Sequence, residues 1–298
     1  MKELYLVAQN AFSISVAEDL PAWAAVSSRY APFAVLTAEK PVLEADIRTW
    51  QLPQCDAEVI YEPAKTGAGF IAARVSRLPD SCLAMEFMHT ERQETRVWMK
   101  MPPTLDKADI GVGPDSDEGD ACFLTHALMI AFMLATAHNG TLLTHASAVT
   151  LRGKAYLFQG KSGSGKSTHS GLWVKNIAGT ELLNDDNPVV RFSADGAAMA
   201  WGSPWSGKTH CYRNAYAPIG AFTRIVQAPE NALRRLPPLK AYASLTASVF
   251  FLPFVSDRLM EIRHKTIERL AQTVACCELR CRPDDEAAFV CQKGLSAY

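Results

Sequence analysis

Short alternations of apolar and polar residues run through the first third of the chain. Residues 4–15 and 69–101 are strand-like, and apolar side chains alternate along residues 71–75, as they do on a half-buried strand. Residues 83–101 predict a β-hairpin. We therefore expect a β-rich N-terminal domain over residues 1–105.

Residues 102–120 interrupt this pattern because they lack apolar periodicity. They are rich in proline, glycine and acidic side chains, which favour a solvated connection over a buried element. The acidic run 115–120 is either a candidate metal-binding cluster or, more simply, a solvated loop that places negative charge at the start of the next helix. We predict that residues 106–120 link two domains.

The remaining residues, 121–298, alternate helix-like and strand-like patterns and are predicted to form a second domain. The patterns predict helices over residues 121–138, 167–176, 240–252, 256–275 and 284–294, and strands over residues 142–151, 155–159, 181–193, 196–205 and 277–281. A tight turn at residues 152–154 joins the first two of these strands. Arg234 and Arg235 are expected on an exposed helix face, or as a clamp for an anion.

The overall composition limits the classes of protein to which this chain can belong. Its 298 residues are 48% hydrophobic and 20% charged, which excludes a disordered or collagen-like chain. Thirty basic residues against 31 acidic ones leave a net charge of −1, too balanced to attract nucleic acid by long-range charge. We expect a globular protein with no nucleic-acid partner.

The chain shows no evident signal for export or for membrane insertion. Its first thirty residues contain no unbroken apolar core. The most apolar stretch, residues 121–137, contains Thr125, His126 and Thr136, which favour a buried helix over a membrane span. Eight cysteines without dense, even spacing are typical of reduced thiols. We expect a soluble, cytoplasmic protein with no membrane partner.

The clearest chemical signal is a glycine-rich loop between a predicted strand and a predicted helix. Such a loop turns its backbone N–H groups toward phosphate oxygens and adds the positive end of a helix. Lys166 is expected to reach the β- and γ-phosphates, and the Ser167 hydroxyl to complete the shell of a Mg²⁺ ion. We therefore expect ATP, or another phosphate donor, together with Mg²⁺. The loop matches G-x-x-x-x-G-K-[ST] without a mismatch, and its residues are Gly160, Lys161, Ser162, Gly163, Ser164, Gly165, Lys166, Ser167 and the following Thr168.

Two carboxylates, Asp185 and Asp186, end the strand that follows this loop. If that strand is a parallel neighbour of the loop's strand, both carboxylates lie beside the phosphates. One would then hold Mg²⁺, directly or through water, while the other accepts the proton of an attacking hydroxyl. An Asp-Asp-Asn turn is also a common structural cap, so the pair alone leaves both interpretations open. His145 lies on an apolar strand, and by itself it is typical of a buried core histidine whose ring nitrogens have hydrogen-bond partners.

Three segments in a fixed order carry a family resemblance: HASAV at residues 145–149, the glycine-rich loop, and LLNDD at residues 182–186. In this order and at this spacing they resemble the HPr kinase/phosphorylase family and its relatives of phosphoenolpyruvate-carboxykinase-like fold. Residues 202–214 and 228–239 are similar to the less characterised HPr-kinase-related proteins. The resemblance covers residues 142–253.

This resemblance implies an α/β fold, in which a phosphoenolpyruvate-carboxykinase-like P-loop kinase core with a mixed sheet follows a smaller β-rich domain. It implies a serine kinase that moves the γ-phosphoryl group of Mg-ATP to a peptide or small protein. By position, His145 matches the family's active-site histidine, and Lys166 and Ser167 match its phosphate and Mg²⁺ ligands. Asp186 matches the acid that takes the proton from the serine hydroxyl. Asp185, the other member of the pair, would then hold the Mg²⁺ ion.

Two departures from the family pattern limit which metal ions and which reactions the resemblance supports. No glutamate occurs over residues 187–229, so the pattern does not support a second Mg²⁺ ion or the reverse, phosphorylase reaction. Lys208 is either a cation offered to the phosphate in place of that metal or an ordinary exposed loop lysine. The N-terminal third shows nothing that aligns with the family's regulatory domain, so the resemblance does not support HPr itself as the substrate.

Two functions other than phosphoryl transfer stay open. The first is a nucleotide-sensing partner protein that binds ATP without turnover. The second, with less support, is a carboxykinase, for which we identify no substrate-binding arginine set. The sequence does not identify the phosphate acceptor. It also leaves open whether the chain forms a homo-oligomer.

Overall fold

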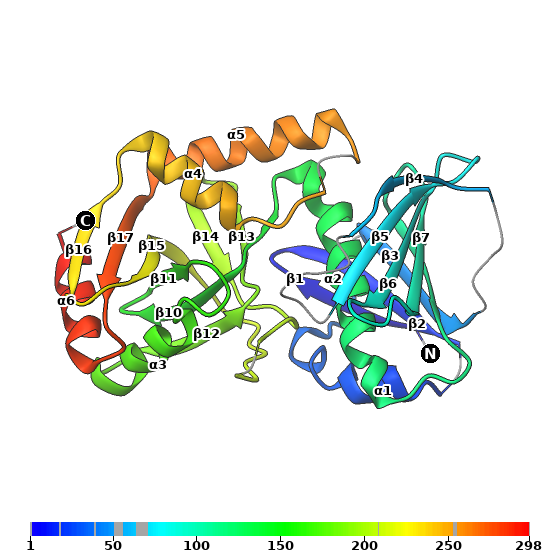
Figure 1. The fold of residues 1–298 in the computed structure, drawn as a ribbon, viewed down its shortest axis with the longest axis horizontal. Helices are drawn as coiled ribbons and strands as arrows, with labels where there is room; N and C mark the ends of the chain where they lie inside the picture. The colour runs from blue at the N-terminus through cyan, green and yellow to red at the C-terminus, as the bar shows by residue number, and fades with distance from the viewer. Residues whose placement is uncertain are drawn as a thin grey trace. The chain divides into compact units, whose positions relative to one another are not determined.

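The computed structural model of the chain describes residues 2–17, 19–38, 40–50, 56–63, 71–207, 209–252 and 255–297. The chain divides into two compact units, Met1–Thr136 and Ala137–Tyr298 (Figure 1). Each unit contains one large sheet with both parallel and antiparallel neighbours. The chain is therefore an α/β protein with two mixed sheets.

An eight-stranded sheet forms the body of the first unit, in the order β1-β2-β3-β8-β7-β6-β5-β4. β2, β3 and β8 run parallel to one another, whereas the other neighbours are antiparallel. Helix α2 (Ala121–Thr136) contacts β3, β6, β7 and β8, and it also contacts the short helix α1 (Pro21–Ser27). The N-terminal unit is rich in β-strands, and β6 and β7 pair as the predicted hairpin. The strands are β1 (Lys2–Val7), β2 (Asn10–Val16), β3 (Leu43–Thr49), β4 (Glu58–Tyr61), β5 (Ile71–Arg77), β6 (Leu83–His89), β7 (Thr95–Met101) and β8 (Lys107–Val112).

The units do not divide at residues 106–120, where we predicted a linker. That segment contains β8, an interior strand between β3 and β7, whose Ala108 and Ile110 are buried. The acidic run is also partly structural, because Arg96 donates to both carboxylate oxygens of the buried Asp120, at 2.7 and 2.9 Å. A short alternating strand was thus hidden in a segment whose composition is typical of a loop. The division falls instead after α2, between Thr136 and Ala137.

A nine-stranded sheet forms the second unit, and its main path runs β12-β10-β11-β15-β14-β13-β9. β17 extends it beside β15, and β16 pairs with β17. β11, β15 and β17 are parallel, and the remaining pairs are antiparallel. The strands are β9 (Leu142–Leu143), β10 (Ala146–Leu151), β11 (Lys154–Gln159), β12 (Glu181–Asp186), β13 (Val189–Phe192), β14 (Ala198–Trp201), β15 (Tyr216–Gln227), β16 (Ala232–Arg235) and β17 (Ala275–Cys281), and the helices are α3 (Lys166–Asn176), α4 (Pro238–Ser248), α5 (Asp257–Thr273) and α6 (Asp285–Leu295).

Helices cover both faces of this second sheet, with α4 and α5 on one face and α3 and α6 on the other (Figure 1). Because successive side chains of a strand point to opposite faces, β11 contributes to two cores. Its Leu157 packs in a cluster with Leu245 of α4, and its Phe158 in a cluster with Trp173 of α3 and Cys291 of α6. Each fully buried side chain of this size contributes about 1.5–3 kcal/mol. The strand that leads into the glycine-rich loop is therefore firmly held.

Several predictions for the second unit need correction. We did not predict β15, although its twelve residues form the central parallel strand. Arg234 lies on β16 and not on a helix, and it donates to Glu278 of β17 at 2.6 Å. The predicted strand 142–151 is interrupted at Thr144 and His145, and the predicted strand 181–193 at Asn187 and Pro188. At both breaks the chain passes between two strand pairs, because β10 pairs with β12 whereas β9 pairs with β13.

One helical stretch, Glu118–Asn139, is long and apolar enough to cross a membrane by length and composition alone. Its mean hydropathy is 1.6, but 72% of its most apolar window is buried within the protein. Core helices of soluble proteins have the same properties. The stretch is therefore weak evidence for a membrane span.

Candidate active site

The glycine-rich loop turns sharply between β11 and α3. Gly160, Gly163 and Gly165 have φ angles of +153°, +76° and +100°, a region that residues with a side chain rarely adopt. At Gly160 space is also tight, since a Cβ there would lie 3.2 Å from the carbonyl oxygen of Ile225 and would meet the side chain of Ser164. Gly165 is the N-cap of α3, so the positive end of that helix opens onto the loop. This geometry suits a phosphate group.

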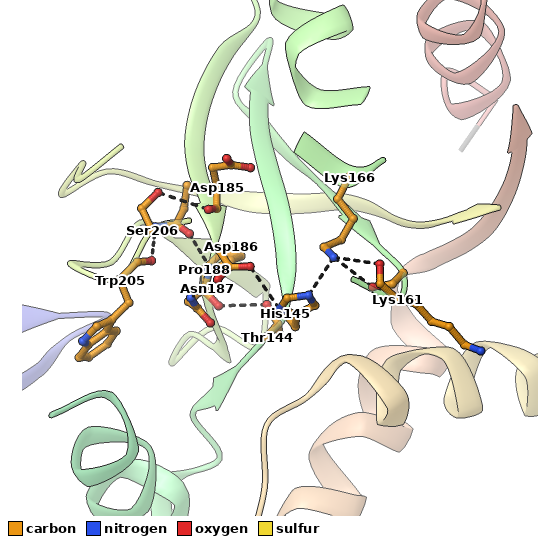
Figure 2. Close-up of polar contacts among 12 residues, drawn as sticks. Thr144, His145, Lys161, Lys166, Asp185, Asp186, Asn187, Pro188, Trp205 and Ser206 are labelled. Atoms are coloured by element: carbon orange, nitrogen blue, oxygen red, sulfur yellow. Dashed lines mark hydrogen bonds and ion pairs between the residues drawn. The ribbon is translucent and has the colours of Figure 1, made fainter. Parts of the chain in front are cut away.

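Lys166, the first residue of α3, points its ammonium group back over the loop. Its Nζ donates to the carbonyl oxygens of Gly160 and Lys161 at 3.1 and 3.3 Å, and lies 2.8 Å from Nε2 of His145 (Figure 2). Burial lowers the pKa of Lys166, whereas the carboxylates of Asp186 and Asp185 oppose that shift. A buried cation with two nearby carboxylates is thus aimed at the place where phosphate oxygens would lie.

The tautomer of His145 follows from its two neighbours. An ammonium group has only protons to offer, so Nε2 of His145 accepts from Lys166 and the ring proton lies on Nδ1. Nδ1 is 3.2 Å from Oδ1 of Asp186, to which it donates. Burial lowers the pKa of His145, and Lys166 adds to this effect while Asp186 opposes it. Lys166, His145 and Asp186 therefore form a continuous chain of hydrogen bonds with a neutral imidazole in the middle.

Sheet topology explains how these three side chains meet. β10 lies between β11 and β12 and is antiparallel to both. Its first residue, Ala146, is in register with Gln159 at the end of β11 and with Asp186 at the end of β12. β12 therefore runs in the same direction as β11, but it is not the direct neighbour that our argument about the two carboxylates considered. The intervening strand brings His145 between the loop and Asp186.

The position of His145 is set by the break between β9 and β10. Its backbone N–H donates to the carbonyl of Ser248 at 2.7 Å, and its ring stands at 88° to the ring of Phe250 with the centroids 5.9 Å apart. The neighbouring Thr144 donates from both its backbone and its hydroxyl to the carbonyl of Pro188. His145 is thus held by the end of α4 and by the segment that follows it.

Asp186 has a backbone conformation that costs energy. Its φ of +146° is rare for any residue with a side chain, and such strain is kept only where the surroundings enforce it. Here an isolated β-bridge pairs Asp186 with Ser206, and the backbone N–H of Gly207 donates to the carbonyl of Asp185. Asn187 donates to Oδ2 of Asp186 at 2.9 Å. Both oxygens of the carboxylate are therefore oriented, Oδ1 by His145 and Oδ2 by Asn187.

A buried polar network that we did not predict supports this turn. Asn184 donates to the carbonyl of Trp205 at 3.1 Å, and its own Oδ1 accepts the backbone N–H of Asn187 at 2.8 Å. Ser203 donates to the carbonyl of Asn187 at 2.7 Å. Asn184 and Ser203 are fully buried. The only signal in the sequence was an asparagine inside an apolar strand, which by itself does not name its partners.

Asp185 has the properties of a metal ligand. Its side chain is buried, Oδ2 accepts the backbone N–H of Thr209 at 3.3 Å, and Oδ1 has no hydrogen-bond partner in the part of the chain that the structure describes. An unpartnered buried carboxylate oxygen is costly, and a hard cation such as Mg²⁺ prefers oxygen ligands. Asp185 is in register with Ser147, which accepts a 2.5 Å hydrogen bond from Ser170 of α3. The residues present therefore fit a Mg²⁺ ion.

The remaining predicted site residues are placed less centrally. Ser167 and Thr168 are exposed on the first turn of α3. Lys161 and Ser162 are exposed too, and the Lys161 side chain points away from His145 (Figure 2). Lys208 lies outside the described residues. Within those residues no group of three or more His, Cys, Asp or Glu side chains is gathered as in an all-protein metal site.

Comparisons with known proteins find only a distant similarity. No protein-family model matches the chain, and no curated protein matches it. Among solved structures it is similar to the Hpr(Ser) kinase/phosphatase from Coxiella burnetii, with a TM-score of 0.31 and 10% sequence identity. That similarity covers 52% of this chain and 93% of the other. A likeness this distant carries no argument about function, which must come from the site itself.

Proposed function

We propose that this protein is a Mg-ATP-dependent phosphotransferase that moves the γ-phosphoryl group to a hydroxyl, namely a serine of a peptide or small protein. One observation carries the proposal: the chain of hydrogen bonds from Lys166 through His145 to Asp186, which begins over a phosphate-binding loop and ends on a strained carboxylate. The order of the segments that resembles the phosphoenolpyruvate-carboxykinase-like kinases adds support for this reaction class.

The loop and Lys166 would bind and neutralise the donor's phosphates. Backbone N–H groups at the start of α3 would face the negatively charged phosphate oxygens, and the ammonium of Lys166 would add a full positive charge. Ser167 and Asp185 would hold Mg²⁺, which supplies further neutralisation of the phosphate oxygens. Phosphoryl transfer depends mainly on such positioning and charge, and little on covalent help from the protein.

Asp186 would act as the general base for the acceptor. As the acceptor oxygen forms its bond to the γ-phosphorus, the bond from that phosphorus to the β,γ-bridging oxygen breaks, and the hydroxyl proton passes to Asp186. The hydrogen bonds from His145 and Asn187 fix the carboxylate plane while leaving lone pairs free for that proton. The neutral His145 also keeps the charges of Lys166 and Asp186 apart.

Transfer of γ-labelled phosphate from Mg-ATP into peptides and small proteins of a cell extract tests this proposal. We expect Asp186→Asn to lower labelling about 10²–10⁴-fold, the usual contribution of a general base, and Lys166→Ala to weaken ATP binding. Asp195→Asn is the matched control, since Asp195 lies exposed on a turn away from the site. Serine labelling independent of Asp186, together with normal ATP binding by Lys166→Ala, would refute the proposal. ATP binding by the native protein without transfer to any acceptor would favour nucleotide sensing instead.

A further inference from the structure

A cavity of about 550 Å³ lies beside the glycine-rich loop, on the face of the second sheet that α4 covers. The loop residues Gly160 to Ser162 line it together with His145. Another wall is formed by the second half of α4 and by the segment that follows it, as far as Phe250. We call this space the α4 cavity. The residues of the proposed function border it but leave it without an occupant.

The α4 cavity borders the place where an acceptor must lie. His145 lines the cavity and donates from Nδ1 to Asp186 at 3.2 Å, so one imidazole ring links the cavity to the proposed base. The exposed fraction is 33% for the His145 side chain and 35% for that of Asp186, so a bound molecule can contact both. An extended peptide advances about 3.3–3.6 Å per residue. A group that fills the cavity would therefore belong to a residue within a few positions of the acceptor serine.

Small side chains of α4 keep this cavity open. Four of them line it as two pairs spaced four residues apart, and residues at that spacing lie on the same side of a helix. None of the four carries a charge, so this wall supplies room and leaves the charge of the cavity to the sheet and the loop. The four residues are Ala243, Ser244, Ala247 and Ser248.

The charge of the α4 cavity is positive. Arg224 of β15 and Lys161 line it, and both are exposed, without a hydrogen bond or ion pair from either side chain to another described residue. None of the described residues that line the cavity is an aspartate or a glutamate. Arg224 projects toward α4, because Phe222, two residues earlier on the same strand, packs in one cluster with Leu245 of α4. An arginine without a partner, beside a cavity without an acid, attracts an anion.

A carboxylate of the acceptor is the anion that suits this place. The guanidinium of Arg224 presents its N–H groups as a fork that matches the two oxygens of a carboxylate. In the proposed function the loop and Lys166 already neutralise the phosphates of the donor, so the anion in the α4 cavity belongs to the acceptor. Among the unmodified side chains of a peptide, only aspartate and glutamate are negatively charged near neutral pH.

We infer that the acceptor carries an aspartate or glutamate within a few residues of its serine, and that Arg224 binds this carboxylate in the α4 cavity. The inference rests on the proposed function for the presence of a peptide acceptor, and it adds the chemical class of that acceptor. Lys161 contributes a second positive charge, although its side chain extends away from His145 (Figure 2). Arg224 is then a specificity-determining residue that takes no part in proton transfer.

A positional-scanning library of peptides with a central serine tests the inference. Glutamate, glutamine, lysine or phosphoserine is fixed at one flanking position at a time, and labelled phosphate transfer from Mg-ATP is measured at low peptide concentration. At one or more positions we expect glutamate to exceed glutamine at least about tenfold in rate, the fold-change that one charge-assisted hydrogen bond supplies. No preference for glutamate at any position would overturn the inference. A preference for phosphoserine with none for glutamate would also overturn it, in favour of a phosphorylated acceptor.

Variants of Arg224 assign the preference to this side chain. Arg224→Gln should bring the ratio of the glutamate to the glutamine rate to within about twofold of one, while the KM for Mg-ATP stays within about twofold of the native value. Arg224→Glu should turn the preference toward lysine, a rescue that damage to the fold would not produce. A raised KM for Mg-ATP in Arg224→Gln, with the peptide preference unchanged, would assign Arg224 to the donor and overturn the inference.

Arg280→Gln is the matched control. Arg280 is an exposed arginine on β17, the parallel neighbour of β15, and it does not line the cavity. This variant should keep the full preference for glutamate. Loss of the preference in both arginine variants would show a general effect of charge and overturn the assignment to the α4 cavity.

Calorimetric titration separates this inference from the proposed function. Two serine peptides that differ only in glutamate against glutamine are titrated into the protein in the presence of Mg-ADP. Tighter binding of the glutamate peptide that depends on Arg224, in a protein that transfers no phosphate, would support the cavity assignment and refute the proposed function. Phosphate transfer to serine with no preference for glutamate would refute the cavity assignment alone.

Discussion

Replacing Gly207 with alanine is expected to damage the position of Asp186 much more than it damages donor binding. A Cβ at Gly207 would lie 2.7 Å from the carbonyl oxygen of Asp185 and 3.1 Å from the Cβ of Asp186. The first distance is shorter than real contacts of a Cβ, and the obstacle is backbone, so the two segments must separate. That separation strains the hydrogen bond from the Gly207 N–H and the bridge between Ser206 and Asp186.

The size of the effect follows from this crowding. Forcing one methyl group into a packed site costs about 1–3 kcal/mol of unfolding free energy. A catalytic group displaced by about 1 Å can lose about 10²-fold in rate, and a shift of a few tenths of an ångström should therefore lower phosphoryl transfer about 10- to 100-fold. Under the proposed function, ATP affinity should change less than about twofold, because Gly207 is not part of the glycine-rich loop.

Denaturant unfolding and labelled-phosphate transfer at saturating Mg-ATP measure these two effects. Gly171→Ala is the control: Gly171 lies within α3, nothing is within 4 Å of the added Cβ, and alanine in place of glycine inside a helix stabilises by about 0.5–1 kcal/mol. It should leave transfer unchanged. Native transfer rate and native stability in Gly207→Ala would refute the reasoning that this close approach holds the base in place.

Three further outcomes are expected. Because burial lowers the pKa of His145 below its ordinary 6.5 in the ligand-free protein, the neutral imidazole persists in mild acid, and kcat/KM measured from pH 8 downward should show no step near pH 6.5 that His145→Gln removes; such a step would contradict a neutral His145. Asp185→Asn should raise the Mg²⁺ concentration for half-maximal transfer at least about tenfold, and an unchanged Mg²⁺ dependence would exclude Asp185 as a ligand. Arg96→Ala leaves the buried Asp120 without its bidentate partner, so it should destabilise the protein by about 3 kcal/mol in urea unfolding, whereas no loss would show that Asp120 is stabilised by other groups.

Much of the chain's local structure could be predicted from the sequence because it depends on neighbours. Glycines at 160, 163 and 165 take φ angles that other residues avoid, so the loop between β11 and α3 was recognisable at once. The hairpin of β6 and β7 and the helices α2, α3 and α5 likewise follow from short-range periodicity. These features need no knowledge of what packs against them.

Other features depend on partners far away in the chain and were missed. β8 lies inside an acidic, glycine-rich stretch, yet it pairs with β3 from more than fifty residues upstream. β15 pairs in parallel with β11 and β17, although its own apolar pattern is unremarkable. Arg234 sits at a spacing that suits a helix, but pairing with β17 makes its segment a strand. Long-range pairing overrides local preference in all three cases.

The candidate site also combines features that the local sequence determines with features that depend on long-range strand pairing. Residue types and spacing by themselves determined that the loop suits phosphate, that two carboxylates follow it, and that a histidine precedes it. Only the tertiary structure decided that β10 separates β11 from β12 and so brings His145 into contact with both Lys166 and Asp186. It also decided the strained backbone of Asp186 and the support from Asn187. The reason is physical: a motif records what a short backbone segment can adopt, whereas the distance between side chains of different strands depends on how the whole sheet is ordered.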